Sequence, residues 1–132
     1  KAFDTVNHQH IFQVLGQKRV DKHVIGLICD LYTNCGTTVE VGGQSSERVK
    51  ILGGVKQGDL LSPVLFSLAL DLLLCSLESK GVGFKYGEQL VTSLAFADDL
   101  ALLRDSWEGM NRNIKVMEEF CQQTGLQVQA SK

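Results

Sequence analysis

The stretch Ala95-Phe96-Ala97-Asp98-Asp99-Leu100-Ala101-Leu102-Leu103 places two adjacent carboxylates inside an apolar run. Without these acids, the run predicts two buried strands, 90–97 and 100–103. An ionised carboxylate in such surroundings costs several kcal/mol unless it is paired, hydrogen-bonded or bound to a metal. In a two-residue hairpin loop, Asp98 and Asp99 project at one end of the strand pair, where their oxygens can bind Mg²⁺. A simple polar turn is the alternative, because Asp is common in turns.

The length and composition of the chain indicate one globular domain. Its 132 residues are enough for a single core, and 44% apolar with 21% charged residues is typical of folded proteins. No apolar run reaches the roughly 18 residues of a membrane span, and no signal sequence is evident, so no membrane partner is expected. The net charge of −2 argues against nucleic-acid binding by bulk positive charge, so any such contact must be local.

The cysteines and histidines do not form a recognisable metal site. No Cys-x-x-Cys pair is present, and the pattern predicts buried, reduced thiols of an intracellular protein at Cys29, Cys35, Cys75 and Cys121. His8 and His10 are two residues apart, so they point to different faces of a helix, and neither they nor His23 has a companion ligand. Surface or helix-end positions are therefore expected for all three histidines.

Hydrophobic periodicity predicts helices over 8–18, 21–34, 62–79 and about 105–124, with strands at 1–7, 83–86 and 126–129. Alternation on both sides of Gly42-Gly43 predicts a hairpin between 37–41 and 48–52. The helix over 62–79 is apolar nearly all round, which is typical of a central core helix. The expected N-caps are Asn7, Asp21, Ser62 and Asp105, with Gly125 closing the last helix.

The inward faces of two other helices also follow from spacing. In the second helix the inward positions are expected to be Val24, Ile25, Leu27, Ile28, Leu31 and Tyr32. In the last helix the apolar stripe of Met110, Ile114, Met117 and Cys121, with Phe120 beside it, predicts core packing and not a cofactor site.

The segment 53–63 is rich in glycine and ends in Ser62-Pro63, which starts a helix. Glycines before a helix allow the backbone to approach a phosphate closely. The spacing matches neither a Walker nor a dinucleotide motif, so a plain connecting loop stays open as the alternative.

Three segments of the chain carry motifs, in this order: Lys1 to His8, Gly54 to Pro63 and Phe96 to Asp99. In these segments and in their order, the chain resembles the reverse transcriptases of non-LTR (LINE-type) retrotransposons. These segments match that family's K-A-F-D-x-V-x-H, G-V-x-Q-G-D-P-L-S-P and F-A-D-D patterns, except that Leu60 replaces a proline. The resemblance implies an α+β fold, an antiparallel sheet packed by helices: the palm of a right-hand polymerase with part of the fingers. Residues 1–132 are then a partial reverse transcriptase domain, without the thumb and the upstream fingers.

The same resemblance implies the metal chemistry of the site. Asp98 corresponds to the principal carboxylate ligand of two catalytic Mg²⁺ ions, which Mn²⁺ can replace, with Asp99 in a lesser role. The family's other metal-binding aspartate precedes the K-A-F-D segment, which places it upstream of Lys1. Asp4 follows the aromatic residue and is not expected to be that ligand.

The substrate contacts are implied in the same way. Phe3 corresponds to the aromatic steric gate that excludes a ribose 2′-hydroxyl, Gln57 lies over the incoming nucleotide, and Gly58 lets the backbone approach it. Lys132 matches a lysine proposed to protonate the pyrophosphate leaving group. The expected partners are an RNA template, a DNA primer and deoxynucleoside triphosphates, and the expected location is the nucleus. The sequence predicts no oligomeric state.

Two competing interpretations remain at this level. One is a non-catalytic scaffold derived from a domesticated or decayed palm, against which the intact Asp98-Asp99 and Gln57-Gly58 pairs argue. The other is the palm of a group II intron maturase. The K-A-F-D-T-V-x-H motif fits such a maturase less well than it fits the LINE-type enzymes.

We predict that the isolated 132-residue chain does not incorporate deoxynucleotides on a primed RNA template. Two-metal nucleotidyl transfer needs two ions about 3.5 to 4 Å apart, and one Asp-Asp turn does not normally hold both. Radiolabelled primer extension with Mg²⁺ or Mn²⁺ provides the measurement, and extension above the no-enzyme level would refute the prediction.

Overall fold

A computed structural model describes residues 2–56, 58–80 and 83–129. Within these residues a 3₁₀ helix, η1 (Ala2–Asp4), is followed by α1 (His8–Gln17), α2 (Lys22–Thr33), α3 (Ser62–Lys80) and α4 (Trp107–Thr124). The strands form two-stranded antiparallel sheets. These pairs are β1 (Gly36–Thr37) with β4 (Val49–Lys50), β2 (Glu40–Val41) with β3 (Gln44–Ser45), β5 (Phe84–Tyr86) with β6 (Gln89–Val91), and β7 (Ser93–Phe96) with β8 (Asp99–Leu102). The elements are those of an α+β fragment, with small separate sheets where one larger sheet was expected.

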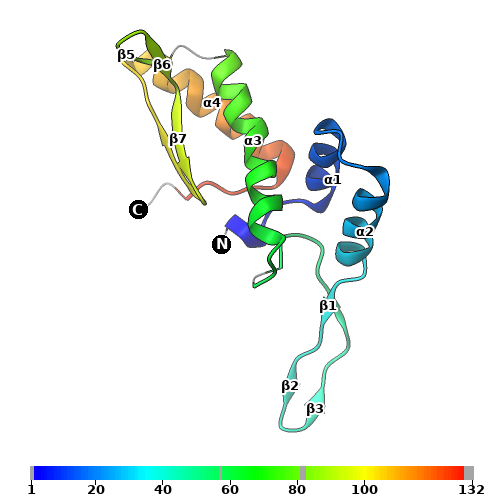
Figure 1. The fold of residues 1–132 in the computed structure, drawn as a ribbon. Coiled ribbons are helices and arrows are strands. Elements are labelled where there is room, and N and C mark those ends of the chain that lie inside the picture. Colours follow the sequence, from blue (N-terminus) through cyan, green and yellow to red (C-terminus); the bar gives the residue numbers. More distant parts are fainter. Residues whose placement is uncertain (1, 57, 81–82, 130–132) are drawn as a thin grey trace.

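Helix α3 is the centre of the fold, as its all-round apolar pattern predicts. It lies between α1 and α4 and packs against both (Figure 1). Its buried apolar side chains are Leu65, Phe66, Ala69, Leu73 and Leu77. By length and composition α3 is also apolar enough to cross a membrane; 33% of this span is buried, on the side that packs against α1 and α4.

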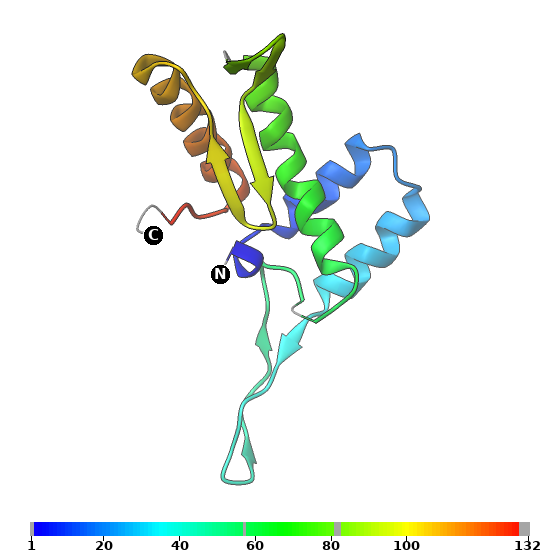
Figure 2. The ribbon, with the colours of Figure 1, turned by 60° about the vertical axis from the view of Figure 1, so that its left-hand side comes forward.

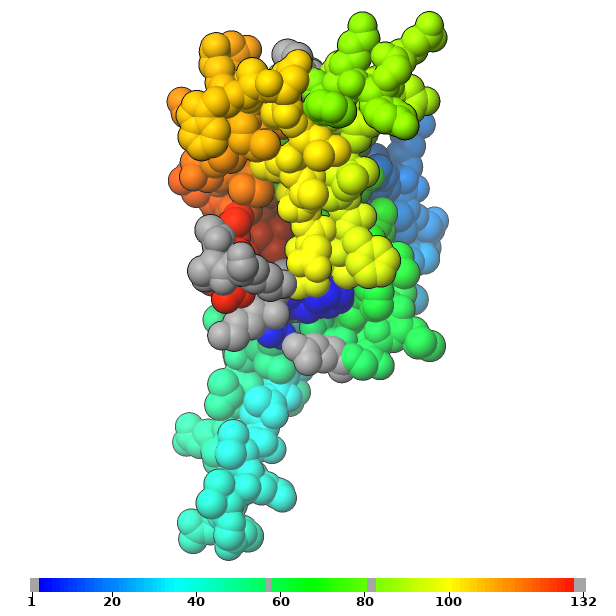
Figure 3. Space-filling model, turned by 90° about the vertical axis from the view of Figure 1, so that its left-hand side faces the viewer, coloured from blue at the N-terminus to red at the C-terminus, as the bar shows by residue number. Residues whose placement is uncertain are grey.

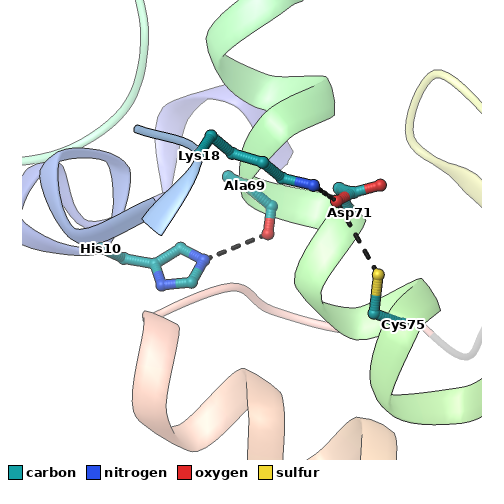
Figure 4. Close-up of polar contacts among 5 residues, drawn as sticks. All are labelled: His10, Lys18, Ala69, Asp71 and Cys75. Atoms are coloured by element: carbon teal, nitrogen blue, oxygen red, sulfur yellow. Dashed lines mark hydrogen bonds and ion pairs between the residues drawn. The ribbon is translucent and has the colours of Figure 1, made fainter. Parts of the chain in front are cut away.

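Polar contacts fix α1 against α3 (Figure 4). The Nε2 atom of His10 donates a hydrogen bond of 3.1 Å to the Ala69 carbonyl oxygen, and the imidazole meets the Phe120 ring edge-on. His10 is buried in the first turn of α1, so of the two positions expected for it the helix end is confirmed and the surface is wrong. At the end of α1, the Lys18 ammonium pairs with the Asp71 carboxylate, which raises the pKa of Lys18. The Cys75 thiol lies 3.8 Å from the same carboxylate.

Helix α2 is more exposed than its periodicity predicts. Asp21 is the N-cap, as expected, and accepts a hydrogen bond of 2.8 Å from the His23 amide. Only Ile28 and Tyr32 are buried. Three positions expected to face inward, Val24, Leu27 and Leu31, are exposed. The reason is that α2 makes its main contacts with α1, which covers only a narrow stripe of the α2 surface.

The predicted hairpin after α2 is present as a long arm that projects away from the helices (Figure 2). Its strands are shorter than expected and are interrupted between β1 and β2 and between β3 and β4. Every residue from 37 to 52 is exposed. Gly42 and Gly43 form the turn, and both have positive φ angles of 60° and 81°.

Several local predictions are wrong. Residues 2–4 form η1 and not a strand, and 126–129 have no regular structure. Ser106, one residue later than expected, caps α4 by accepting a hydrogen bond of 3.2 Å from the Gly109 amide. Ser62 is the first residue of α3 and not its N-cap, and its hydroxyl donates to the Lys56 carbonyl oxygen at 2.5 Å. Gly125 does end α4, in the left-handed conformation.

All four cysteines are free, but they are less buried than predicted. Cys75 is exposed, and the other three are partly buried. Burial and the nearby Glu118 charge raise the pKa of the Cys121 thiol.

We expect iodoacetamide to modify Cys75 faster than Cys121 at pH 8. The thiolate is the reactive form, and Cys121 is both less accessible and harder to ionise. Peptide mass spectrometry over time measures both rates, with Cys75→Ser as the control for peptide assignment. Equal rates at the two positions would contradict the packing of α4.

Candidate active site

The two adjacent acids lie at the tight turn between β7 and β8, with Asp98 in the turn and Asp99 directly after it. Phe96 pairs with Asp99, so the turn consists of Ala97 and Asp98, and Asp99 is the first residue of β8. The sequence predicted a loop of Asp98 and Asp99, which is one residue out of register. Ala97 has a φ angle of 52°, a conformation that costs a non-glycine residue about 1 to 2 kcal/mol. A strained residue next to Asp98 indicates a turn with a defined geometry.

The β7–β8 hairpin is buried on one face only. Leu100 and Leu102 pack against the core, whereas Leu94 and Phe96 on the other face are 60% and 84% exposed. Both aspartates are exposed as well. The expectation of two buried strands is therefore wrong, because only alternate residues of each strand meet the core. Asp98 and Asp99 do not need a partner to offset desolvation, so the case for a metal site rests on their chemistry and position.

A second part of the site is formed where the chain after η1 meets the glycine loop. The Val55 amide donates to the Phe3 carbonyl oxygen at 2.7 Å, and the Gly54 amide donates to that of Val6 at 2.8 Å. An isolated antiparallel bridge joins Asn7 to Gly53. The Phe3 ring stacks on Phe66 of α3 with centroids 4.3 Å apart. Residues 3–7 and 53–55 are therefore held as one unit on α3.

Gly54 is required by this close approach. Its φ angle is 83°, and a Cβ atom placed on it would lie 2.7 Å from the Asp4 Cα atom. His8 supports the same residue from α1, because its Nε2 donates a hydrogen bond of 2.8 Å to the Gly54 carbonyl oxygen. The sequence singled out the glycine loop but missed this contact, since a histidine at a helix start gives no signal of its distant partner.

Tyr32 completes the support of the loop from α2. Its ring meets the His8 imidazole edge-on with centroids 5.0 Å apart, and the Lys56 ammonium lies 5.8 Å from the centre of the Tyr32 ring. A pocket of about 330 Å³ opens here, lined by Asp4, His8, Tyr32, Cys35, Ile51 and Gly53 to Lys56. Asp98 is not among the lining residues, so Asp4 and Asp98 border different spaces.

The remaining predicted site residues lie on separate elements. The β7–β8 turn lies next to η1, which carries Phe3 (Figures 2 and 3). Gly58 is exposed in the loop before α3, with a φ angle of 88° that favours glycine. Gln57 and Lys132 lie outside the described residues. The structure thus brings the Asp98 turn and the Phe3 segment to the same region of the molecule.

The acid pair has the right chemistry for an open Mg²⁺ site. Mg²⁺ in nucleotide-processing enzymes is usually held by one or two carboxylates, with water and substrate phosphates completing the shell. Asp98 and Asp99 can supply such carboxylates, and their exposure leaves room for the other ligands. Across 2–56, 58–80 and 83–129, no group of three His, Cys, Asp or Glu side chains forms a closed metal cage.

Comparison with known proteins identifies the family to which the chain belongs. The family model described as "Reverse transcriptase (RNA-dependent DNA polymerase)" matches residues 1–132. The chain therefore belongs to the reverse transcriptase family, whose members generally use divalent metals.

Individual relatives show which reverse transcriptases the chain is similar to. The chain is 40% identical to the Retrovirus-related Pol polyprotein from type-1 retrotransposable element R2 of Popillia japonica. It is 36% identical to the type-2 R2DM polyprotein of Drosophila melanogaster and 35% to a type-1 R2 polyprotein of Nasonia vitripennis. Each match covers 100% of this chain but only 19%, 12% and 13% of these relatives. The resemblance to non-LTR retrotransposon reverse transcriptases is confirmed.

We predict that Gly54→Ala destabilises the chain by about 2 to 5 kcal/mol, the sum of left-handed strain and overpacking against Asp4. Gly53→Ala is the matched control, because a Cβ there would lie 3.6 Å from the nearest atom, the Val6 carbonyl oxygen. Urea unfolding followed by circular dichroism gives both free energies of unfolding. Equal stabilities of the two variants would show that the close approach of Gly54 to Asp4 does not exist.

Proposed function

We propose that this chain is the catalytic palm segment, with part of the fingers, of an RNA-directed DNA polymerase. The observation that carries the proposal is the exposed acid pair at a strained two-residue turn, placed beside the segment that carries Phe3. The family membership and the R2 relatives support the same function. In the whole protein, the partners are an RNA template, a DNA primer and deoxynucleoside triphosphates, and its place of action is the nucleus.

The reaction joins a primer 3′-oxygen to the α-phosphorus of the incoming nucleotide and breaks the bond between that phosphorus and the oxygen bridging to the β-phosphate. Asp98 would be the principal ligand of two Mg²⁺ ions, or of Mn²⁺ in their place, and Asp99 would take a lesser role. When bound, these ions would activate the attacking oxygen and neutralise the leaving pyrophosphate. The short turn keeps the Asp98 backbone from moving when substrate enters, because Ala97 and the Phe96–Asp99 pair restrict it.

The nucleotide site is assigned to Phe3, Gln57 and Gly58. The Phe3 ring is half-buried and stacked on Phe66, so it is held rigidly enough to exclude a 2′-hydroxyl. Gly58 offers an exposed backbone with no side chain for the close approach of the nucleotide. Lys132 is the proposed proton donor to the pyrophosphate. The contacts of His8 and Tyr32 support this site by fixing the loop that leads to Gln57 and Gly58.

Titration with Mn²⁺ distinguishes this function from that of a non-catalytic scaffold, which has no reason to bind metal at Asp98. We expect Mn²⁺ to broaden the amide signals of residues 96–100 in the ¹⁵N spectrum of the chain, and Mg²⁺ to compete. Asp98→Asn should weaken binding about tenfold, the effect of losing one charged ligand contact, and Asp99→Asn should weaken it less.

The matched control is Asp30→Asn, an exposed aspartate on α2 that is expected to leave Mn²⁺ binding unchanged. Broadening that spreads over the acidic surface without a focus at 96–100, or that persists in Asp98→Asn, would favour the scaffold.

A further inference from the structure

A partly buried arginine, with too few acceptors among the described residues, lies beyond the open end of the β7–β8 hairpin. Arg104 follows β8, and its Nη2 atom donates to the Oδ1 atom of Asn113 on α4. The other two guanidinium nitrogens, Nε and Nη1, are buried and have no hydrogen-bond partner among the described residues. Asn113 itself is only 1% exposed, and its Nδ2 atom is also without a partner. The pair therefore holds several buried N–H groups for which the described part of the chain provides no acceptor.

This arrangement is unfavourable unless an acceptor arrives from outside. Buried polar groups in native proteins nearly always have partners, and an uncompensated buried cation is strongly destabilising. Burial lowers the pKa of the Arg104 guanidinium, and the Arg112 charge lowers it further, whereas Asp105 opposes this effect. Arg104 is charged at neutral pH, and its local environment disfavours that charged form. A nearby anion would stabilise the charged guanidinium.

A pocket of about 170 Å³ adjoins this arginine. It is lined by Lys80, Arg104, Ser106, Glu108, Gly109 and Arg112. Three of these side chains are cationic and one is anionic, and the Glu108 carboxylate already accepts a hydrogen bond of 2.8 Å from the Arg112 Nη2 atom. The first turn of α4 forms part of the wall, so the positive end of that helix adds to the field. The pocket is cationic in a chain whose net charge is −2.

We propose that this pocket binds a phosphate-type oxyanion, with Arg104, Lys80 and Arg112 as its ligands. The chemistry favours phosphate over a carboxylate, because a phosphate presents several acceptor oxygens to cations that come from the end of α3, the segment after β8 and the first turns of α4. The site is separate from Asp98, which lies at the opposite end of the β7–β8 hairpin. Its phosphate comes either from a nucleic-acid phosphodiester or from a free phosphate ion.

The test follows the Arg104 side-chain Nε–H signal by NMR during titration of the chain with inorganic phosphate, against chloride at equal ionic strength. A saturable shift specific to phosphate is expected. Lys80→Gln and Arg112→Gln should each weaken the affinity about tenfold, as expected for the loss of one charged contact. Lys115→Gln, an exposed charge change on the same helix outside the pocket, should leave the affinity unchanged.

Asn113→Asp is the decisive variant. It places a carboxylate beside Arg104 within the fold, so it should abolish phosphate binding and raise the melting temperature. A second titration with a uridine tetranucleotide that lacks terminal phosphates identifies the source. A shift of the same Arg104 signal that is lost in Asn113→Asp assigns the site to a nucleic-acid phosphodiester, and a response to inorganic phosphate alone assigns it to the free ion.

Absence of both responses would overturn the proposal. So would phosphate binding that survives in Asn113→Asp, or that weakens equally in Lys115→Gln, because general screening of the surface would then explain the shift.

Discussion

The backbone hydrogen bonds between residues 3–7 and 53–55 are the constraint on which the arrangement of this domain depends. They join the start of the chain to the loop before α3, two segments about fifty residues apart, at N···O distances of 2.7 and 2.8 Å. The contact is close because Gly54 has no side chain and adopts a positive φ angle. Since Phe3 also stacks on Phe66, this small unit is anchored directly to the core helix.

The end of the last helix is attached to the same unit. The Asn7 amide donates to the Thr124 carbonyl oxygen at 3.1 Å, and Thr124 is buried. Asn7 therefore takes part in three structures at once: it caps α1, bridges to Gly53 and contacts the end of α4. Segments that are distant in the sequence are positioned through this residue, and the β7–β8 turn lies beside them (Figure 2).

The acid pair and the cationic pocket illustrate two ways of placing charge. Asp98 in the turn and Asp99 at the start of β8 are exposed, so water screens them and a divalent ion can reach them. Arg104 is partly buried, and its Nε and Nη1 atoms have no acceptor among the described residues, so these N–H groups cost more because little water reaches them. The net charge of the chain is −2, so the chain as a whole is only mildly acidic. This value describes the local charge of neither site.

The sequence alone determined the features that depend on neighbouring residues. The N-caps Asn7 and Asp21, the end of α4 at Gly125, the core character of α3 and the hairpin at Gly42-Gly43 all follow from local periodicity or turn chemistry. The order of three motifs also indicated the family correctly. Only the tertiary structure decided which faces are covered, because burial depends on partners far away in the chain. It exposed Leu27 and Leu31, buried His10 and Asn113, and moved Asp99 from the turn into β8. A shift of one residue in strand pairing changes which side chains occupy the turn, and that register is set by Leu100 and Leu102 meeting the core.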